Sequence, residues 1–241
     1  YEEGRAMGTF AQETANDYQM TREEMDEYSI ESLRRANAAI DSGAFADEVV
    51  PVTFSTRKGE VTVEHDEQPG KGRPDKIPQL RPAFAKDGTI TAATSSSISD
   101  GAAAVVLSRE SVAKANGQQP VAKIVAMAAH AQEPAQFTVA PIGAIEKVLD
   151  KAGWSADEVE LWEVNEAFAC VAMFAMRDIG IPHDRINVNG GGTALGHPIG
   201  ASGTRIIVTL LNALKQQGKK RGVASLCIGG GEATAVAVEL V

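Results

Sequence analysis

The feature that most constrains the fold is a glycine-rich segment at residues 187–205, which leads directly into an apolar helical pattern. Six of its nineteen residues are glycine, and His197 lies between Gly196 and Pro198. Glycine adopts backbone conformations that other residues avoid, so this density indicates a tight turn or a close backbone approach. A turn that opens a helix directs free amides towards an anion or a developing oxyanion. The segment therefore predicts a turn that presents a histidine for acid–base chemistry.

A second glycine-rich turn follows at residues 226–232, with Cys227 ahead of three consecutive glycines. A histidine and a cysteine on separate glycine turns are typical of an acyl-transfer site. Taken singly, each feature has an ordinary explanation: a turn, a satisfied histidine and a small buried thiol. All three in this order make that explanation the weaker one. The position of Cys227 beside the turn is consistent with a lowered pKa of its thiol.

Strands and helices alternate along the second half of the chain. Apolar stretches that suit strands occur at residues 120–130, 161–164, 186–189, 221–228 and 233–240. Helical patterns lie between them at residues 142–152, 167–179 and 201–217. Strands that alternate with helices of this length predict an α/β layered fold.

The first half has a different organisation. Residues 21–46 begin with a capping box formed by Thr21 and Glu24 and are predicted to be helical. Two alternating strands are expected at residues 49–54 and 60–64, and a charged loop at residues 67–78. Further on we expect a strand or buried segment at 101–107 and a helix at 109–116.

Composition excludes several classes of protein. The formal net charge is −9, which argues against a nucleic-acid partner because nucleic acids are also negatively charged. No apolar run approaches the length of a membrane span. Two cysteines provide no disulfide framework and suit a reducing compartment, so we expect a cytoplasmic protein. The four histidines are scattered, and no metal-ligand cluster is apparent.

The motifs resemble those of the thiolase family, and most closely its short-chain acetyl-CoA acetyltransferases. Residues 187–205 are similar to the family pattern N-x-x-G-G-x-x-A-L-G-H-P-x-G-x-S-G-x-R. Residues 227–231 are similar to C-x-G-G-G, and residues 165–168 to N-E-A-F. The resemblance implies a mixed five-stranded sheet with helices on both faces, together with an α+β loop domain. It assigns residues 1–98 to the loop domain over coenzyme A, 99–118 to the end of the N-terminal domain, and 119–241 to the C-terminal domain.

The resemblance also implies catalytic roles. His197 activates a nucleophilic cysteine and helps to bind a thioester oxygen, and Cys227 is the acid/base for a second acetyl group. Asn165 holds a water that forms one oxyanion hole with His197, and the Gly229 amide contributes to the other. Glu166 is either a further site residue or a residue that orients the turn.

Further residues are implied to bind the substrate, a coenzyme A thioester, with no tightly bound cofactor. Ser96 and Met7 are expected along the pantetheine arm, and Phe137 in the acyl pocket. Lys71 and Lys76 are expected near the nucleotide phosphates, with solvated loop charges as an equal alternative.

The resemblance leaves the nucleophile unaccounted for. The family carries it in an N-terminal segment that precedes the matched region, and Cys170 lies in a helical apolar pattern that indicates burial. We therefore expect the full-length protein, a homodimer or homotetramer, to interconvert acetyl-CoA and acetoacetyl-CoA, and this chain alone to be inactive. A noncatalytic module that binds coenzyme A or assists assembly is the alternative.

Overall fold

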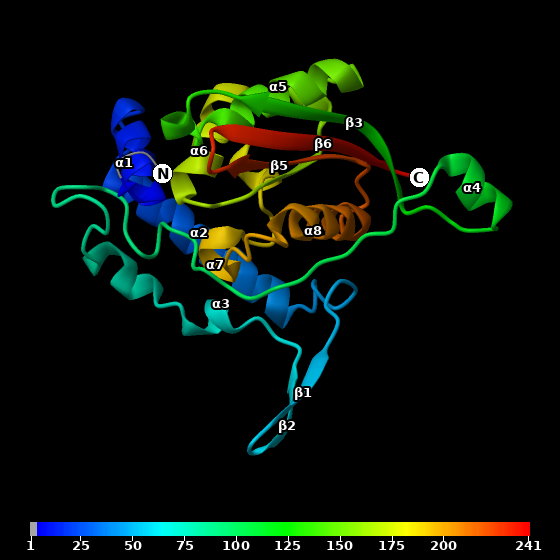
Figure 1. The fold of residues 1–241 in the computed structure, drawn as a ribbon, viewed down its shortest axis with the longest axis horizontal. Helices are drawn as coiled ribbons and strands as arrows, with labels where there is room; N and C mark the ends of the chain where they lie inside the picture. Colours follow the sequence, from blue (N-terminus) through cyan, green and yellow to red (C-terminus); the bar gives the residue numbers. More distant parts are fainter. Residues whose placement is uncertain (1–3) are drawn as a thin grey trace.

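The computed structural model describes residues 4–241, so residues 1–3 of the predicted loop domain lie outside it. The C-terminal part is built on one mixed sheet in the order β3-β6-β5-β4 (Figure 1). Only the β4–β5 pair is parallel, and the other two pairs are antiparallel. The strands are β3 (Ala122–Ala131), β4 (Leu161–Val164), β5 (Arg221–Ile228) and β6 (Glu232–Leu240).

Helices cover both faces of this sheet, as the family resemblance implies. Figure 1 shows α5 (Ala140–Ala152) and α6 (Ala169–Ile179) on one side of the strands, and α8 (Ser202–Gln216) on the other. Because side chains alternate along a strand, successive residues of one strand enter different cores. Leu161 packs with α8, whereas Trp162 belongs to the core beneath α5 and α6.

The predicted fifth strand at residues 186–189 does not form. Ile186 makes a single parallel bridge to Trp162, and the sheet has four strands among the described residues. Asn187 has a φ of 46°, in the left-handed region that asparagine tolerates better than most residues. This conformation turns the chain away from the sheet edge. The α/β class is confirmed, and the strand count of five is wrong.

The first half of the chain packs beside this sheet. It begins with α1 (Met7–Asp17) and continues with α2 (Arg22–Asp41), whose capping box of Thr21 and Glu24 forms as predicted. A two-stranded hairpin follows, β1 (Val52–Thr56) with β2 (Gly59–Val63), and both strands are exposed along their whole length. The hairpin projects away from the rest of the molecule (Figure 1).

Two short helices occupy the predicted loop at residues 67–78. They are α3 (Glu67–Lys71) and the 3₁₀-helix η2 (Pro74–Gln79). Proline at the first position of a helix costs no hydrogen bond, so Pro74 begins η2 rather than preventing it. The prediction of a loop at residues 67–78 is therefore wrong where α3 and η2 form.

The segment 101–107 is neither a strand nor buried. Val106 is 96% exposed and Leu107 is 71% exposed, and regular structure resumes only at α4 (Glu110–Ala115). A strand needs neighbouring backbone groups to pair with. Residues 4–241 supply no such strand partner for this segment, so it has no regular secondary structure. No helix in the described part of the chain is long and apolar enough to cross a membrane.

Candidate active site

His197 lies in a turn between α7 (Gly192–Leu195) and α8. Its amide donates to the carbonyl of Ser97 at 2.9 Å, which anchors the turn against the segment that follows Thr94. Gly196 has a φ of 92°, and a Cβ there would lie 2.2 Å from Oγ of Ser99. Both the backbone angle and the lack of space therefore require glycine immediately before the histidine.

The two ring nitrogens of His197 face different partners. Nδ1 lies 2.5 Å from Oγ of Ser202, and Nε2 lies 3.5 Å from Nδ2 of Asn165. Burial, and secondarily the positive charge of Arg205, lower the pKa of His197. The ring is therefore neutral near neutral pH, which is the state that a general base requires.

Asn165 stands on the turn that follows β4. Its side chain is buried, and its backbone amide donates to the carbonyl of Ser225 on β5 at 3.0 Å. Its Oδ1 atom is buried without a hydrogen-bond partner in the described part of the chain. Buried polar atoms are nearly always satisfied, so this oxygen is suited to accept from a small donor such as water.

Cys227 lies near the end of β5, two residues beyond Ser225. Its side chain is buried, and burial raises the pKa of its thiol to about 12. The expected lowering of the thiol pKa is therefore wrong. The thiol packs within the core beneath α5 and α6, where a thiolate would lose its solvation. A thiol held in its protonated form is suited to donate a proton.

Gly229 lies in the turn after β5. The turn is exposed, and within residues 4–241 the Gly229 amide has no hydrogen-bond acceptor. A Cβ at this glycine would stand 3.4 Å from Cε of Met7, so the methionine side chain lies against the turn. The structure thus brings the predicted residues Met7 and Gly229 together.

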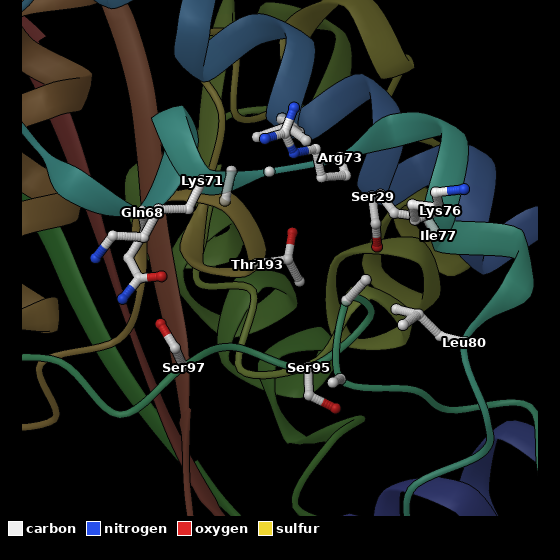
Figure 2. A pocket seen from close by; sticks show the side chains of 15 residues that line it. Ser29, Gln68, Lys71, Arg73, Lys76, Ile77, Leu80, Ser95, Ser97 and Thr193 are labelled. Carbon is white, nitrogen blue, oxygen red and sulfur yellow. The ribbon is translucent and has the colours of Figure 1, made fainter.

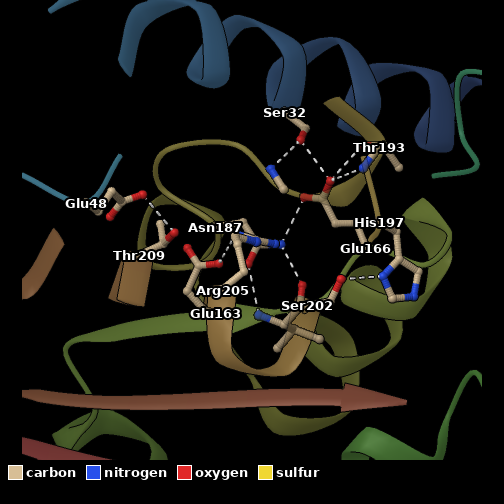
Figure 3. A network of polar contacts seen from close by, with 12 residues as sticks. Ser32, Glu48, Glu163, Glu166, Asn187, Thr193, His197, Ser202, Arg205 and Thr209 are labelled. Atoms are coloured by element: carbon tan, nitrogen blue, oxygen red, sulfur yellow. Dashed lines mark hydrogen bonds and ion pairs between the residues drawn. The ribbon is translucent and has the colours of Figure 1, made fainter. Parts of the chain in front are cut away.

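Glu166 is the centre of a buried network (Figure 3). Its Oε1 accepts from the hydroxyl of Tyr28 and from Nδ2 of Asn187, both at 2.9 Å. Its Oε2 accepts from Ser32 at 2.8 Å, and from the amide and hydroxyl of Thr193 at 3.1 and 2.6 Å. These five donors saturate a carboxylate that is completely buried.

This network connects distant parts of the chain. Tyr28 and Ser32 come from α2, whereas Asn187 and Thr193 flank the glycine segment before His197. The geometry favours the second of the two sequence interpretations of Glu166, a residue that orients the turn. Sequence reasoning did not identify Tyr28 and Ser32, although their spacing of four residues places them on one face of a helix.

Arg205 and Glu163 contact each other to one side of His197 (Figure 3). Nη1 of Arg205 on α8 is 3.4 Å from Oε2 of Glu163 on β4. Burial raises the pKa of Glu163 to about 8, although the charge of Arg205 acts in the opposite direction. Glu48, whose carboxylate accepts from Thr209 at 3.1 Å, also has a pKa raised by burial.

A cavity of about 370 Å³ opens between α2, α3, η2 and α7 (Figure 2). Lys71 and Lys76 line it together with Arg73. Their ammonium groups lie near carboxylates of their own helices, 3.7 Å from Glu67 and 3.8 Å from Asp75. Both side chains are more than half exposed, so their charges remain available to an anionic ligand in the cavity.

Ser96 and Phe137 take different positions relative to this cavity. The Ser96 hydroxyl donates to the carbonyl of Ala167 at 2.9 Å, while its neighbours Ser95 and Ser97 line the cavity. Phe137 is buried and packs at an angle against Phe168, with ring centroids 6.3 Å apart. The aromatic contact links Phe137 to the N-E-A-F turn.

Cys170 is completely buried on α6, as its helical pattern indicates. Burial raises the pKa of its thiol, with a smaller contribution from Cys227. Within residues 4–241, no group of three or more histidine, cysteine or acidic side chains could hold a metal ion.

Comparison with protein families shows what the chain is similar to. Residues 118–240 match the family described as "Thiolase, C-terminal domain", and residues 1–111 match "Thiolase, N-terminal domain". The chain is 49% identical to the acetyl-CoA acetyltransferase of Yarrowia lipolytica over 98% of its own length. It is 48% identical to the acetyl-CoA acetyltransferase of Rhizobium meliloti, also over 98% of its length.

Solved structures agree with these relatives. The acetyl-CoA acetyltransferase of Bacillus anthracis superposes with a TM-score of 0.97 at 40% identity, over the whole of this chain. The Acat5 thiolase of Ascaris suum in complex with coenzyme A gives a TM-score of 0.90 at 40% identity, over 99% of this chain. The chain spans 59% and 60% of the two enzymes compared by sequence, and 61% of each solved chain.

Proposed function

Because the chain belongs to the thiolase family, we propose that the full-length protein is an acetyl-CoA C-acetyltransferase. It joins two molecules of acetyl-CoA into acetoacetyl-CoA and free coenzyme A, or runs the reverse thiolysis. One observation carries the proposal. The side chain of Asn165 contacts the ring of His197, and its backbone amide donates to Ser225 on β5. Ser225 lies two residues before Cys227. Three motifs that are far apart in the sequence therefore meet at the carboxyl ends of two parallel strands.

The roles follow from the chemistry of a Claisen condensation. A neutral His197 takes the proton of a nucleophilic cysteine, which then attacks the thioester carbonyl and releases coenzyme A. Cys227 exchanges the α-proton of the second acetyl group. Asn165, through a water on its open Oδ1, and the free amide of Gly229 stabilise the negative charge that develops on the two thioester oxygens.

The nucleophile is the component that this chain does not supply. Cys170 and Cys227 are both buried, with thiol pKa values raised by burial. We propose that the nucleophilic cysteine belongs to the N-terminal part that the longer relatives possess.

The cavity beside α2 is the proposed site for coenzyme A, which acts as substrate rather than as a tightly bound cofactor. Lys71 and Lys76 offer two cations on its rim for phosphate groups. Ser96, Met7 and Phe137 are proposed to line the path from that cavity to the acyl site. The assignment of residues 1–98 as the domain that covers coenzyme A is part of the same proposal, as are 99–118 and 119–241 as the two further units.

Thiolysis of acetoacetyl-CoA by the full-length protein is the direct test. We expect the thioester of acetoacetyl-CoA to be consumed in the presence of coenzyme A, with acetyl-CoA as product. A full-length protein that binds coenzyme A but shows no thiolysis or condensation would instead support the noncatalytic binding module.

We also propose a cytoplasmic homodimer or homotetramer. Two unpaired cysteines support a reducing compartment. An apolar face on the exposed hairpin, with Val52 opposite Val63 and Phe54 opposite Val61, supports association. Light scattering of the full-length protein and imaging of a tagged copy test these two points.

A further inference from the structure

Ser202 contacts Nδ1 of the His197 ring (Figure 3), whereas Asn165 faces the other ring nitrogen, Nε2. It is the first residue of α8, its side chain is buried, and its Oγ atom is 2.5 Å from Nδ1 of the histidine. The helix start does not account for this hydroxyl, because Ala201 occupies the N-cap position and no side chain caps α8.

The protons of this contact can be assigned from its neighbours. A serine hydroxyl has one proton, and Oγ of Ser202 donates to the carbonyl of Pro198 at 3.0 Å. Such bonding to the carbonyl four residues earlier is common for serine in helices, even where that carbonyl also accepts amides, as Pro198 does from Ala201 at 2.8 Å and from Ser202 itself at 2.9 Å. With its proton directed there, Ser202 presents a lone pair to Nδ1, which must then carry a proton.

The other side of the ring favours the same arrangement. Nδ2 of Asn165 is a donor and faces Nε2, which must offer a lone pair to it. Both neighbours therefore favour the neutral tautomer with its proton on Nδ1.

We infer that Ser202 is a positioning residue that holds His197 in the Nδ1-protonated tautomer, so that Nε2 is the nitrogen that exchanges protons with the reactants. This inference rests on the proposed function. The thiol of the nucleophilic cysteine gives its proton to Nε2 and keeps the electron pair as a thiolate. The thiolate forms a bond to the acyl carbon, the bond to the coenzyme A sulfur breaks, and that sulfur takes the proton from Nε2. The Nδ1 proton stays in place throughout.

The charges around the ring are consistent with this exchange. Arg205, also on α8, disfavours the imidazolium, and its Nη1 lies 3.4 Å from Oε2 of Glu163 on β4, whose carboxyl has a pKa raised by burial to about 8. Glu166, on the turn after β4, is saturated by its five donors. A hydroxyl beside Nδ1 stabilises the imidazolium less than a carboxylate would, so the proton on Nε2 is readily returned.

The test uses the full-length protein labelled with ¹⁵N-histidine, whose ring shifts distinguish a protonated nitrogen from a bare one. His197 is assigned by the signal that is lost in His197→Asn. We expect the Nδ1-protonated tautomer in the parent protein, and a mixture of tautomers with a lower His197 pKa in Ser202→Ala. Ser202→Thr, which keeps a hydroxyl, should restore the parent spectrum. Thr14→Val is the matched control, because the Thr14 hydroxyl also bonds the carbonyl four residues earlier, at 3.1 Å.

A kinetic measurement accompanies the spectra. Acyl transfer in Ser202→Ala should fall about 100-fold in kcat, within the range that a general base contributes, with KM little changed. If the alanine variant does not fold, Ser202→Cys replaces it. The thiol of cysteine is close in volume to the serine hydroxyl but is a poor hydrogen-bond acceptor, so the same fall in kcat is expected. A parent ring protonated on Nε2, or a tautomer ratio unchanged in both variants, would overturn the inference. Because the spectra need no turnover, failure of the proposed thiolase activity remains a separate result.

Discussion

The two glycine turns of the site differ in how much of their environment this chain provides. The His197 turn is fixed by several contacts within the chain. The backbone of His197 bonds Ser97, and its ring contacts Ser202 and Asn165. The segment before it is bonded to the Glu166 network. The turn after Cys227 is exposed, its Gly229 amide is open, and Ile228 is 44% exposed.

The two turns therefore differ in how many of their contacts lie within residues 4–241. The histidine is preorganised by residues 4–241 themselves. The start of the cysteine turn, Ile228–Gly230, and the segment 101–107 are exposed, and the chain covers only 61% of the Bacillus anthracis enzyme. If the proposed function holds, we expect the full-length protein to cover the exposed second turn. The following predictions test that contrast, from the largest effect to the smallest.

The chain of 241 residues alone should show no thiolase turnover. Without an accessible thiolate no acyl-enzyme forms, and the preorganised His197 turn has no nucleophile to act on. The measurement is incubation with radiolabelled acetyl-CoA, followed by assays for label on the protein and for free coenzyme A. Saturable acetylation of Cys170 or Cys227 with turnover would contradict it.

Replacement of Cys227 by serine in the full-length protein should lower condensation by about 10²- to 10⁴-fold, the contribution of a general acid/base. Acyl transfer to the nucleophile should persist, because His197 is untouched. Rates of the two half-reactions separate these effects. Cys170→Ala is the control and should retain activity, while near-normal condensation in Cys227→Ser would show that this thiol is only structural.

Glu166→Ala should destabilise the His197 turn most. It removes the shared acceptor of five donors, of which only Nδ2 of Asn187 keeps another, the carbonyl of Val164, at a cost of about 3 kcal/mol or more. Urea unfolding of the variant and its parent measures this cost. Tyr28→Phe removes only one of the five donors, so its effect should be about 1 kcal/mol. Equal stability of Glu166→Ala and the parent would show that the Glu166 network does not stabilise the His197 turn.

An alanine at each turn gives a matched pair. Gly196→Ala should cost about 1–3 kcal/mol, because its φ is 92° and the new Cβ would meet Ser99. Gly229→Ala should change stability by less than about 0.5 kcal/mol, since the Cβ meets only the flexible end of the Met7 side chain, Cε at 3.4 Å and Sδ at 3.8 Å. Thermal unfolding of the two variants compares them, and equal losses would mean that the turns are equally constrained.

Glu163 should make the free energy of unfolding depend on pH. Its folded pKa of about 8 lies above the model-peptide value of 4.5, so the folded state binds the proton more tightly. The stabilisation that Glu163 adds to the folded state is complete below pH 4.5 and is lost as the pH rises towards 8. The free energy of unfolding falls by at most about 1.4 kcal/mol per pH unit in this range. Glu163→Gln should flatten stability across this window. A slope that is unchanged in Glu163→Gln would assign the dependence to other groups.

Local patterns determined much of this protein. The capping box at Thr21, the amphipathic helices and the alternating strands depend on neighbours within a few residues, so the α/β class and most elements follow from the sequence. The glycine turns with His197 and Cys227 were recognisable for the same reason, because positive φ angles and tight turns select particular residues locally.

Tertiary structure decided what depends on distant neighbours. Asn187 bonds the backbone of Val164 on β4 with its side chain, which also contacts Glu166 and Tyr28, and the expected fifth strand is reduced to one bridge. The segment 101–107 has a strand pattern but no partner within residues 4–241. Burial raises the pKa of the Cys227 thiol where the turn alone indicated a lowering. In each case the result depends on desolvation or on hydrogen-bond partners far away in the chain, and no local pattern encodes those.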